Sequence, residues 1–346
     1  MIEFEPFAIS TCEARFRPVH AQRDYRPGKN DPFSPFEIHD PFGLRNAIVP
    51  VFRQHVDGRM YGMGTAFQVD GFGSFLSAYH VVDYVAQPLA GRPILFLSMH
   101  AVVFGTIRVP DDCFVPVEEV VAPMMEKEDP MAALRGDASR QPAIDVALMK
   151  PASIGLGALP PQTLPVRAVG LMPTVGDIVL AVGFPQLDLS EINREEQAAL
   201  ITEGMYGAYG RIVAIHAQGV SRSNPTPVFE IESDWPGGMS GGPVFNQAGE
   251  VIGIVSRSLR AEAGHHGIGY AVHLGLAHVI EPLVPNLDIF NPGWRKCWGL
   301  FTEIDPTPVS FHATQAEAQK AAAMLTALTK ILPVSNQIGT TGFIEL

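Results

Sequence analysis

Short apolar runs, rich in β-branched and aromatic residues, recur between residues 46 and 272, and glycine, proline or aspartate separates each run from the next. Such runs with frequent turn residues are typical of antiparallel β structure, because an extended strand needs few residues between two reversals of the chain. The pattern therefore predicts an all-β fold, built as a sandwich or as barrels. The runs lie at 46–54, 64–82, 92–110, 144–151, 176–185, 210–219, 227–233, 242–258 and 267–272.

Few segments have the pattern of a helix. The segment 190–204 is bounded by a serine and a glycine that would cap a helix, and the apolar segment 273–284 would end at its proline. The segment 313–332 is rich in alanine and amphipathic, which predicts a helix near the C-terminus. Residues 1–45 show little periodicity, so we expect an irregular N-terminal extension.

The balance of apolar and charged residues limits the classes of partner. Of the 346 residues, 47% are hydrophobic and 17% are charged, so the chain can bury a sizeable core in one large domain or two of ordinary size. The net charge is −12, and no long basic run is present. A groove that follows phosphates, or a face that binds an anionic bilayer, needs clustered lysine and arginine. We therefore expect no nucleic acid and no membrane as partners.

The N-terminal residues and the cysteines bear on the cellular compartment. The sequence does not start with a basic segment followed by an apolar one, as a secretory signal does, and no apolar run approaches the length of a membrane span. Cys12, Cys113 and Cys297 are odd in number and far apart, which favours neither a disulfide framework nor a zinc site. These features predict a reducing, cytoplasmic setting, and we expect no metal ion or other cofactor.

A single serine, Ser240, lies among four glycines in the stretch DWPGGMSGGPVF, residues 234–245. A serine acts as a nucleophile only beside a base that takes its proton and beside donors that hold the oxyanion. In such a turn the N–H groups of Gly238 and Ser240 can both point at one oxygen, and a side chain at position 238 would obstruct that approach. The alternative is a glycine-rich hairpin that only needs positive φ angles.

The base expected beside such a serine is a histidine at the end of a structured segment. Of the 11 histidines, His80 fits best, because it follows an alternating run and precedes a short valine-rich turn in SFLSAYHVVDYV. His265 and His266 lie in a glycine-flanked loop, while His273 and His278 are too far round a helix to share a metal. The alternative for His80 is a core histidine whose hydrogen bonds are satisfied.

The third group expected is a buried carboxylate that fixes the imidazole tautomer. Asp145 in AIDVALMKP is an acid within an apolar run, where a charge is costly unless it has a partner. Asp83, Asp111 and Asp137 lie in polar or turn-like surroundings and fit this role less well. The alternative for Asp145 is an acid at a strand edge that reaches solvent.

The order of these three stretches, SAYHVV, IDVALMK and GMSGGPVF, resembles that of the trypsin-like, chymotrypsin-fold serine peptidases, and within them the HtrA/Deg-type branch. GTAFQVDGFGSFLSAYHVV is similar to the strands that lead to the histidine of that branch, and VGDIVLAVGFP to the first strand of its second barrel. GEVIGIVS and GIGYAV are similar to the strands that flank its specificity pocket. The similarity covers roughly residues 46–284.

The resemblance implies two perpendicular six-stranded antiparallel β-barrels with few helices and with a catalytic triad in the cleft between them. Ser240 would be the nucleophile, His80 the general base and then acid, and Asp145 the orienting carboxylate. The amides of Gly238 and Ser240 would form the oxyanion hole. The chain would divide into an extension at 1–45, a peptidase domain at 46–284 with barrels at about 46–160 and 165–284, and a C-terminal extension at 285–346 with an amphipathic helix.

The sequence departs from the family pattern in three places. Met239 stands where digestive members carry an acid that pairs with a newly cut N-terminus, so activation by such a cut is not expected. The residues after 285 are too few for the PDZ domain that HtrA-type members usually carry. The segment 186–205 is inserted after GFP, and its charged helix would cover the cleft or dock a partner, or else be a solvated surface helix.

The sequence leaves two preferences open for the substrate residue that the pocket binds. Asp234 lies six residues before Ser240, where trypsin-like members hold an acid that binds a basic side chain at P1, the substrate residue before the scissile bond. Ile268 falls on the pocket wall, where a branched side chain would favour a small or medium apolar P1 residue. Ser256 could supply a hydrogen bond to Asp234 if no cationic ligand is bound.

Two functions of different classes follow. The first is a serine endopeptidase that cleaves a protein or peptide substrate through an acyl-enzyme, with an activating protein partner because nothing else in the sequence resembles a sensor. The second is a latent trypsin-fold binding or assembly module whose activity depends on a partner. A serine esterase of the α/β-hydrolase type fits poorly, since that fold needs serine before aspartate before histidine.

Overall fold

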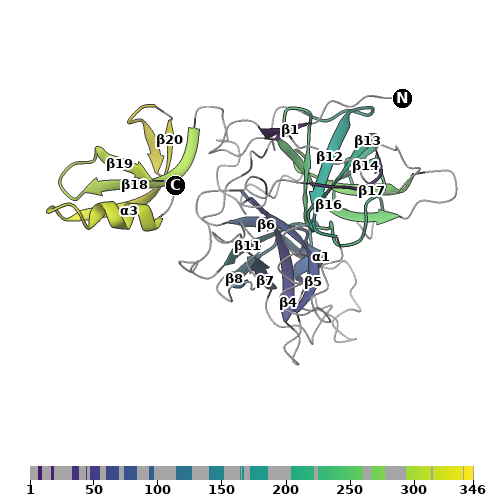
Figure 1. The fold of residues 1–346 in the computed structure, drawn as a ribbon, viewed down its shortest axis with the longest axis horizontal. Helices are drawn as coiled ribbons and strands as arrows, with labels where there is room; N and C mark the ends of the chain where they lie inside the picture. Colours follow the sequence, from purple (N-terminus) through teal and green to yellow (C-terminus); the bar gives the residue numbers. More distant parts are fainter. Residues whose placement is uncertain are drawn as a thin grey trace.

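The computed structural model of the chain is built mainly of β-strands (Figure 1). The structure describes residues 7–9, 17–18, 33–38, 44, 47–54, 60–69, 74–83, 93–96, 114–126, 140–151, 164, 166, 172–185, 204–221, 225–259, 266–276, 294–312, 315–337 and 339–345.

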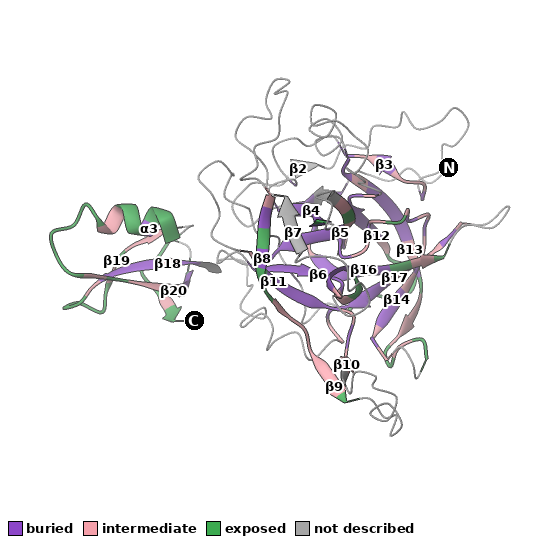
Figure 2. Ribbon diagram, turned by 90° about the horizontal axis from the view of Figure 1, so that it is seen from below, coloured by how far each residue is buried: buried purple, intermediate pink, exposed green. Residues whose placement is uncertain are grey.

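Six strands form a closed antiparallel barrel in the order β11-β6-β5-β4-β7-β8, which we call barrel 1. In β8 the buried Val115 and Val117 alternate with the exposed Pro116 and Glu118, as expected of a strand with one face on the core. β4 is buried at all but its last residue, and Figure 2 marks buried residues in purple. The strands are β4 (Ile48–Gln54), β5 (Met60–Gln68), β6 (Phe75–Ser77), β7 (Pro93–Phe96), β8 (Phe114–Val121) and β11 (Ala147–Pro151).

A second antiparallel sheet, barrel 2, has the order β12-β15-β16-β17-β14-β13 and adds β3 beyond β13. β12 pairs with β13 as well as with β15, so that these six strands curl round and meet. The strands are β3 (Phe36–Glu37), β12 (Ile178–Gly183), β13 (Tyr206–His216), β14 (Val228–Glu232), β15 (Pro243–Phe245), β16 (Val251–Leu259) and β17 (Ile268–His273).

These two sets of strands confirm the predicted all-β fold with two six-stranded antiparallel barrels. Each run predicted as strand contains or overlaps one. Outside these runs the prediction misses β3, β8, the short pair β9 (Met124–Glu126) and β10 (Arg140–Pro142), and the C-terminal strands described below. In 114–126 the prolines and glutamates hide the alternation.

One buried cluster joins the two barrels. It includes Phe67 and Leu76 from barrel 1 and Leu180 and Phe245 from barrel 2, each essentially without solvent exposure. Buried apolar surface of this kind is the main favourable contribution to folding, and it holds two separately closed barrels in a fixed relation. The ends of strands that come from different barrels can therefore form one site.

Part of the N-terminal extension is built into barrel 2, contrary to the expectation of an irregular segment. β3 pairs with β13 through Phe36, whose ring stacks on that of Tyr209 with centroids 5.4 Å apart. Phe7 packs edge-on against the same ring at 5.2 Å. The carbonyl of Phe33 accepts the N–H of Asp234 at 3.1 Å. Single aromatic anchors at irregular spacing carry this docking, so periodicity does not reveal it.

The C-terminal segment forms a separate four-stranded sheet, which lies apart from the barrels in Figure 1. The helix predicted over 313–332 is shorter: α3 covers Gln315–Ala322 and buries only Ala318. Residues 329–332 belong instead to β20, which pairs with β18 along its whole length. A full ladder of hydrogen bonds outweighs local helix propensity here. The strands are β18 (Trp294–Thr302), β19 (Pro308–His312), β20 (Thr329–Gln337) and β21 (Phe343–Glu345).

The other predicted helices are largely outside the described residues. Of the segment 190–204 only Gly204 is described. In 273–284, His273 is the last residue of β17, a turn follows through Leu276, and the remainder is not described. Within the described ranges, no helix combines the length and the apolar character that a bilayer crossing requires.

Candidate active site

His80 and Asp145 come together because the strands that carry them are neighbours. His80 lies in the single-turn helix α1 (Tyr79–Val82), which begins two residues after β6. Asp145 lies two residues before β11, and β6 pairs with β11 from Phe75 to Ser77. Antiparallel pairing places the end of one strand beside the start of the other. Residues 65 positions apart in the chain are therefore in direct contact.

The carboxylate of Asp145 holds His80 at two points. The Nδ1 of His80 lies 2.9 Å from Oδ2 and 3.1 Å from Oδ1, and the backbone N–H of His80 donates to Oδ1 at 3.1 Å. The His80 side chain is 47% exposed and that of Asp145 18% exposed. The contact through Nδ1 leaves the other ring nitrogen, Nε2, directed elsewhere and able to act as a base.

Two residues of barrel 2 complete the surroundings of Asp145. The hydroxyl of Ser256 donates to Oδ2 at 2.5 Å, and the N–H of Asp145 donates to the hydroxyl of Thr226 at 3.1 Å. Hydrogen bonds of this kind satisfy a carboxylate that would otherwise be costly to bury. The carboxylate is thus held between the barrels and not at a strand edge open to solvent.

The pKa values of the pair move apart. Burial alone would lower the pKa of His80, but the hydrogen bond to Asp145 and its negative charge together raise it above the ordinary value. Burial alone would raise the pKa of Asp145, but the hydrogen bonds from His80 and Ser256 and the charge of His80 lower it. Asp145 therefore stays ionised more readily than a free aspartate, and His80 holds a proton more readily than a free imidazole.

Two separate physical requirements explain why the residues around Ser240 are glycines. Gly238 and Gly241 have φ angles of 97° and 85°, which side chains disfavour. A Cβ on Gly241 would also collide with the carbonyl of Thr65 and the hydroxyl of Ser77 in barrel 1. A Cβ on Gly64 would likewise come within 2.6 Å of the carbonyl oxygen of Ser240. The turn is therefore more than a hairpin that needs positive φ, because its glycines also allow the two barrels to approach.

The loop before Ser240 is fixed by Thr65. The Oγ1 of Thr65 donates to the carbonyl of Gly238 at 3.2 Å and accepts the N–H of Phe184 at 2.9 Å. The N–H of Thr65 donates to the carbonyl of Ser240 at 2.8 Å. Among the described residues, neither the N–H of Gly238 nor that of Ser240 has an acceptor. Both donors are thus unpaired within the part of the chain that the structure describes.

The hydroxyl of Ser240 is turned to Ser256. Its Oγ donates to the carbonyl of Ser256 at 3.1 Å, and no hydrogen bond joins it to His80 in the described part of the chain. Because Ser256 also donates to Asp145, this one residue touches both Ser240 and Asp145. The structure thus links Ser240 through Ser256 to the carboxylate that holds His80, and the serine hydroxyl is bonded to a carbonyl instead of to the imidazole.

The predicted pocket residues are arranged differently from the expectation. Ser256 donates its hydroxyl to Asp145 and not to Asp234. The Oδ1 of Asp234 accepts the N–H of Gly267 at 2.7 Å, and its Oδ2 lies 3.6 Å from Nδ1 of His266. Ile268 is half-buried at the start of β17. The expected hydrogen bond fails because the side chain of Ser256 faces barrel 1, where a carboxylate already accepts it.

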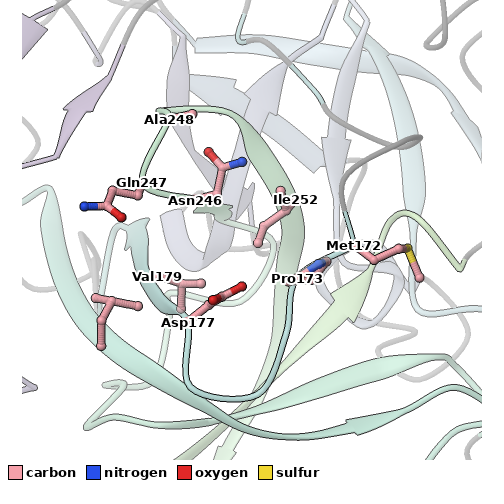
Figure 3. Close-up of a pocket in the computed structure, with 9 residues that line it drawn as sticks. Met172, Pro173, Asp177, Val179, Asn246, Gln247, Ala248 and Ile252 are labelled. Atoms are coloured by element: carbon pink, nitrogen blue, oxygen red, sulfur yellow. The ribbon is translucent and has the colours of Figure 1, made fainter.

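A pocket of about 220 Å³ lies elsewhere on barrel 2, between the start of β12 and the turn that joins β15 to β16. Figure 3 shows Asn246 and Ile252 on one side of it and Val179 and Asp177 on the other. Asn246 is hydrogen-bonded to Glu250 across the turn, and Asp177 accepts the N–H of Thr174. Its polar groups hold local turns, and none of the residues of the His80–Asp145–Ser240 site lines it.

Three residues that the sequence does not single out support the site: Thr65, Ser77 and Thr226. Ser77 donates to the carbonyl of Thr65 at 2.7 Å and so steadies the residue that holds the Ser240 loop. Each lies more than ten positions from the group that it supports. A hydroxyl residue within a β-prone run gives no local sign of such a role.

Known relatives share the central part of the chain. The family model of the trypsin-like peptidase domain matches residues 64–254. A "Probable periplasmic serine endoprotease DegP-like" of Pseudomonas savastanoi pv. phaseolicola is 32% identical over 182 residues, which cover 51% of this chain and 32% of that protein. A protein of the same name from Pseudomonas putida strain GB-1 is 30% identical over 195 residues, which cover 55% and 35%. The chain spans about a third of the length of these relatives.

Among solved structures, the chain is similar to the Rv3671c protease. The crystal structure of its inactive form has 16% identity and a TM-score of 0.41, and the match covers 70% of this chain and 90% of that chain. The active form, from M. tuberculosis, has the same identity and TM-score and is covered to 82%.

The predicted cytoplasmic setting is wrong on this comparison, since the relatives are named periplasmic enzymes. The cysteines misled the prediction. A chain with a core of this size does not need disulfides for stability in any compartment, so three widely spaced cysteines do not indicate a reducing one. Cys297 is fully buried, which keeps a thiol unreactive irrespective of the compartment.

Proposed function

The chain belongs to the trypsin-like peptidase domain family, and from this premise we propose that it is a serine endopeptidase whose triad is His80, Asp145 and Ser240. The substrate is a protein or peptide. One observation carries the proposal: His80 is bonded to the largely buried carboxylate of Asp145, Ser256 links that carboxylate to Ser240, and the loop of Ser240 has two N–H groups without acceptors in the described chain. That combination supplies a base, a nucleophile and an oxyanion site at one point.

The reaction begins when the Ser240 side chain rotates from the Ser256 carbonyl towards His80. Nε2 of His80 takes the hydroxyl proton as Oγ forms a bond to the carbonyl carbon of the substrate. The electron pair of the carbonyl moves to its oxygen, which the N–H groups of Gly238 and Ser240 stabilise. His80 then gives its proton to the leaving nitrogen, and the C–N bond breaks. Water releases the acyl group by the same steps, with His80 again as the base.

Asp145 acts on His80 throughout. It stays ionised and keeps the imidazole in the tautomer with its proton on Nδ1, so that Nε2 has a free electron pair. When His80 gains its second proton, the neighbouring carboxylate stabilises the imidazolium. The hydrogen bond from Ser256 keeps the carboxylate oriented.

One observation supports a second function, the latent binding or assembly module. The hydroxyl of Ser240 is bonded to the Ser256 carbonyl and not to the base. In that arrangement the serine is not activated, and a binding partner would have to change the loop. The inserted segment 186–205 is one place where such a partner could dock.

A fluorophosphonate probe distinguishes the two functions, because it reacts covalently only with an activated serine. We expect the wild type to be labelled and Ser240→Ala to be unlabelled. Ser310→Ala is the matched control, since Ser310 lies 2.7 Å from Nε2 of His312 in the C-terminal sheet, far in sequence from the proposed site. It should be labelled like the wild type. A folded wild type that stays unlabelled would favour the latent module.

A further inference from the structure

We propose that the indole of Trp235 fills the space for the P1 side chain, so that the enzyme cleaves after small residues, glycine or alanine. This inference rests on the proposed function and deepens it. It also chooses between the two preferences that the sequence leaves open, a basic and an apolar P1 residue.

The position of the P1 side chain follows from the site itself. The carbonyl carbon of that residue must reach Oγ of Ser240, and its oxygen must lie at the N–H groups of Gly238 and Ser240. Its side chain then lies beside the loop that leads to Ser240, on the side where β16 passes at Ser256. Two observations join these walls: Ser240 donates to the carbonyl of Ser256 at 3.1 Å, and Ser258 donates to the carbonyl of Trp235 at 2.9 Å.

We place the ring of Trp235 between these walls, because its backbone is bonded to β16 and its side chain is buried. It is 6% exposed and belongs to the same buried cluster as Met239, the residue directly before Ser240. Its ring lies against Gly269 in β17, where a Cβ would come within about 2.6 Å of ring carbon atoms. Ala271, the next inward residue of β17, is also small. The small residues Gly269 and Ala271 of β17 thus leave room for the large ring of Trp235 beside them.

The indole cannot easily leave this position. The Trp235 carbonyl is held by Ser258, and the N–H of Asp234, the residue before it, donates to Phe33 in the docked N-terminal segment. Within the described chain the indole Nε1 is buried and has no acceptor, so the ring is held by packing and not by a hydrogen bond of its own. Closely packed rings resist displacement, and a large P1 side chain would have to displace this one.

Asp234 does not provide for a basic P1 residue. Its carboxylate accepts the N–H of Gly267 and lies 3.6 Å from Nδ1 of His266. These contacts direct it to the loop before β17. A carboxylate that already holds a backbone donor and faces a histidine is not aimed at a substrate cation beside Ser240.

The test is a set of peptides that are identical except for P1, which is glycine, alanine, leucine, phenylalanine or arginine. We expect the wild type to cleave after alanine or glycine with kcat/KM at least about tenfold above the other three. Trp235→Gly should raise the ratio of kcat/KM for the phenylalanine peptide to kcat/KM for the alanine peptide by about tenfold or more. Phe52→Leu, which removes a buried ring from barrel 1, is the control and should leave the ratio unchanged.

If Trp235→Gly does not fold, Trp235→Leu takes its place. We then expect a smaller shift of kcat/KM in favour of the leucine peptide. A wild type that cleaves after phenylalanine or arginine as well as after alanine would overturn the proposal. Labelling of Ser240 by the fluorophosphonate separates a failure of the pocket assignment from a failure of the proposed function, because that probe carries no P1 side chain. If Ser240 is labelled but Trp235 variants keep the wild-type ratios, the pocket assignment fails alone. If folded protein is not labelled, the proposed function fails and the pocket assignment fails with it.

Discussion

His273 should make barrel 2 sensitive to mild acid. It is the last residue of β17, is 1% exposed, and packs against the ring of Phe229 with centroids 5.5 Å apart. Neither ring nitrogen has a hydrogen bond to another described residue. Burial lowers the pKa of His273 to about 4, which outweighs a contact with its own backbone that would raise it. The folded chain therefore keeps this imidazole neutral where an unfolded chain would protonate it.

The sign and size of the effect follow from proton linkage. A histidine in the unfolded chain takes up its proton at about pH 6.5, but His273 does so only at about pH 4, so stability is lost as the pH falls between these values. From about pH 7.5 to about pH 4.5 the loss amounts to about 2–3 kcal/mol in the free energy of unfolding. His80 acts in the opposite direction, because its raised pKa gives stability that is present at low pH and lost as the pH rises.

A substitution isolates the contribution of His273. His273→Leu removes the titration and keeps a similar volume, so its stability should change less with pH than that of the wild type, by the amount given above. His216→Gln is the control, because His216 lies on the same barrel but is paired with Glu230 at 2.9 Å. It should keep the wild-type loss in acid. Urea unfolding, followed by tryptophan fluorescence and far-ultraviolet circular dichroism, gives the free energy at each pH.

The reasoning is refuted if wild type and His273→Leu lose stability in parallel, to within about 1 kcal/mol, between the two pH values. It is also refuted if the imidazole of residue 273 titrates near the ordinary histidine value when followed by nuclear magnetic resonance. Either result would mean that water or a proton reaches the inside of barrel 2 in the native state.

Three further outcomes test the site. Activity is lost as His80 gains a proton, and the pKa of His80 is raised, so the acid limb of kcat/KM should have its midpoint above pH 6.5. Asp145→Asn should move that midpoint to lower pH. A midpoint that does not move would contradict the pairing of His80 with Asp145. Thr65→Val should lower kcat by about tenfold with KM little changed, because Gly238 loses the contact that fixes the oxyanion loop; equal kcat values would exclude this role. Deletion of residues 188–203 should change peptide cleavage if the segment covers the cleft, and identical kinetics would identify it as a surface segment.

Much of this molecule can be read from local sequence. The alternation and turn residues of the strand runs predict antiparallel β structure, because the fit of a side chain to a pleated sheet repeats every second residue, while the two barrels are implied by the resemblance to trypsin-like peptidases. The glycines around Ser240 are equally local, since a positive φ and a close approach of the backbone both require that residue type. Sequence order together with these features was enough to select His80, Asp145 and Ser240 as candidates.

Other features depend on partners that are distant in sequence. Residues 329–332 are strand because β18 pairs with them, although their neighbourhood favours helix. Nothing in the sequence indicates that Ser256 bonds Asp145, or that the ring of Trp235 lies against Gly269. The same holds for the N-terminal aromatic anchors on barrel 2.

The sequence by itself determined which strands and turns can form and which residues can carry the chemistry. Only the tertiary structure decided the partner of each group, the rotamer of Ser240 and the filling of the pocket. The physical reason is one of range. Backbone preferences and strand periodicity act between near neighbours, whereas contacts such as those between His80 and Asp145 or between Ser256 and Asp145 exist only once barrels have closed and packed.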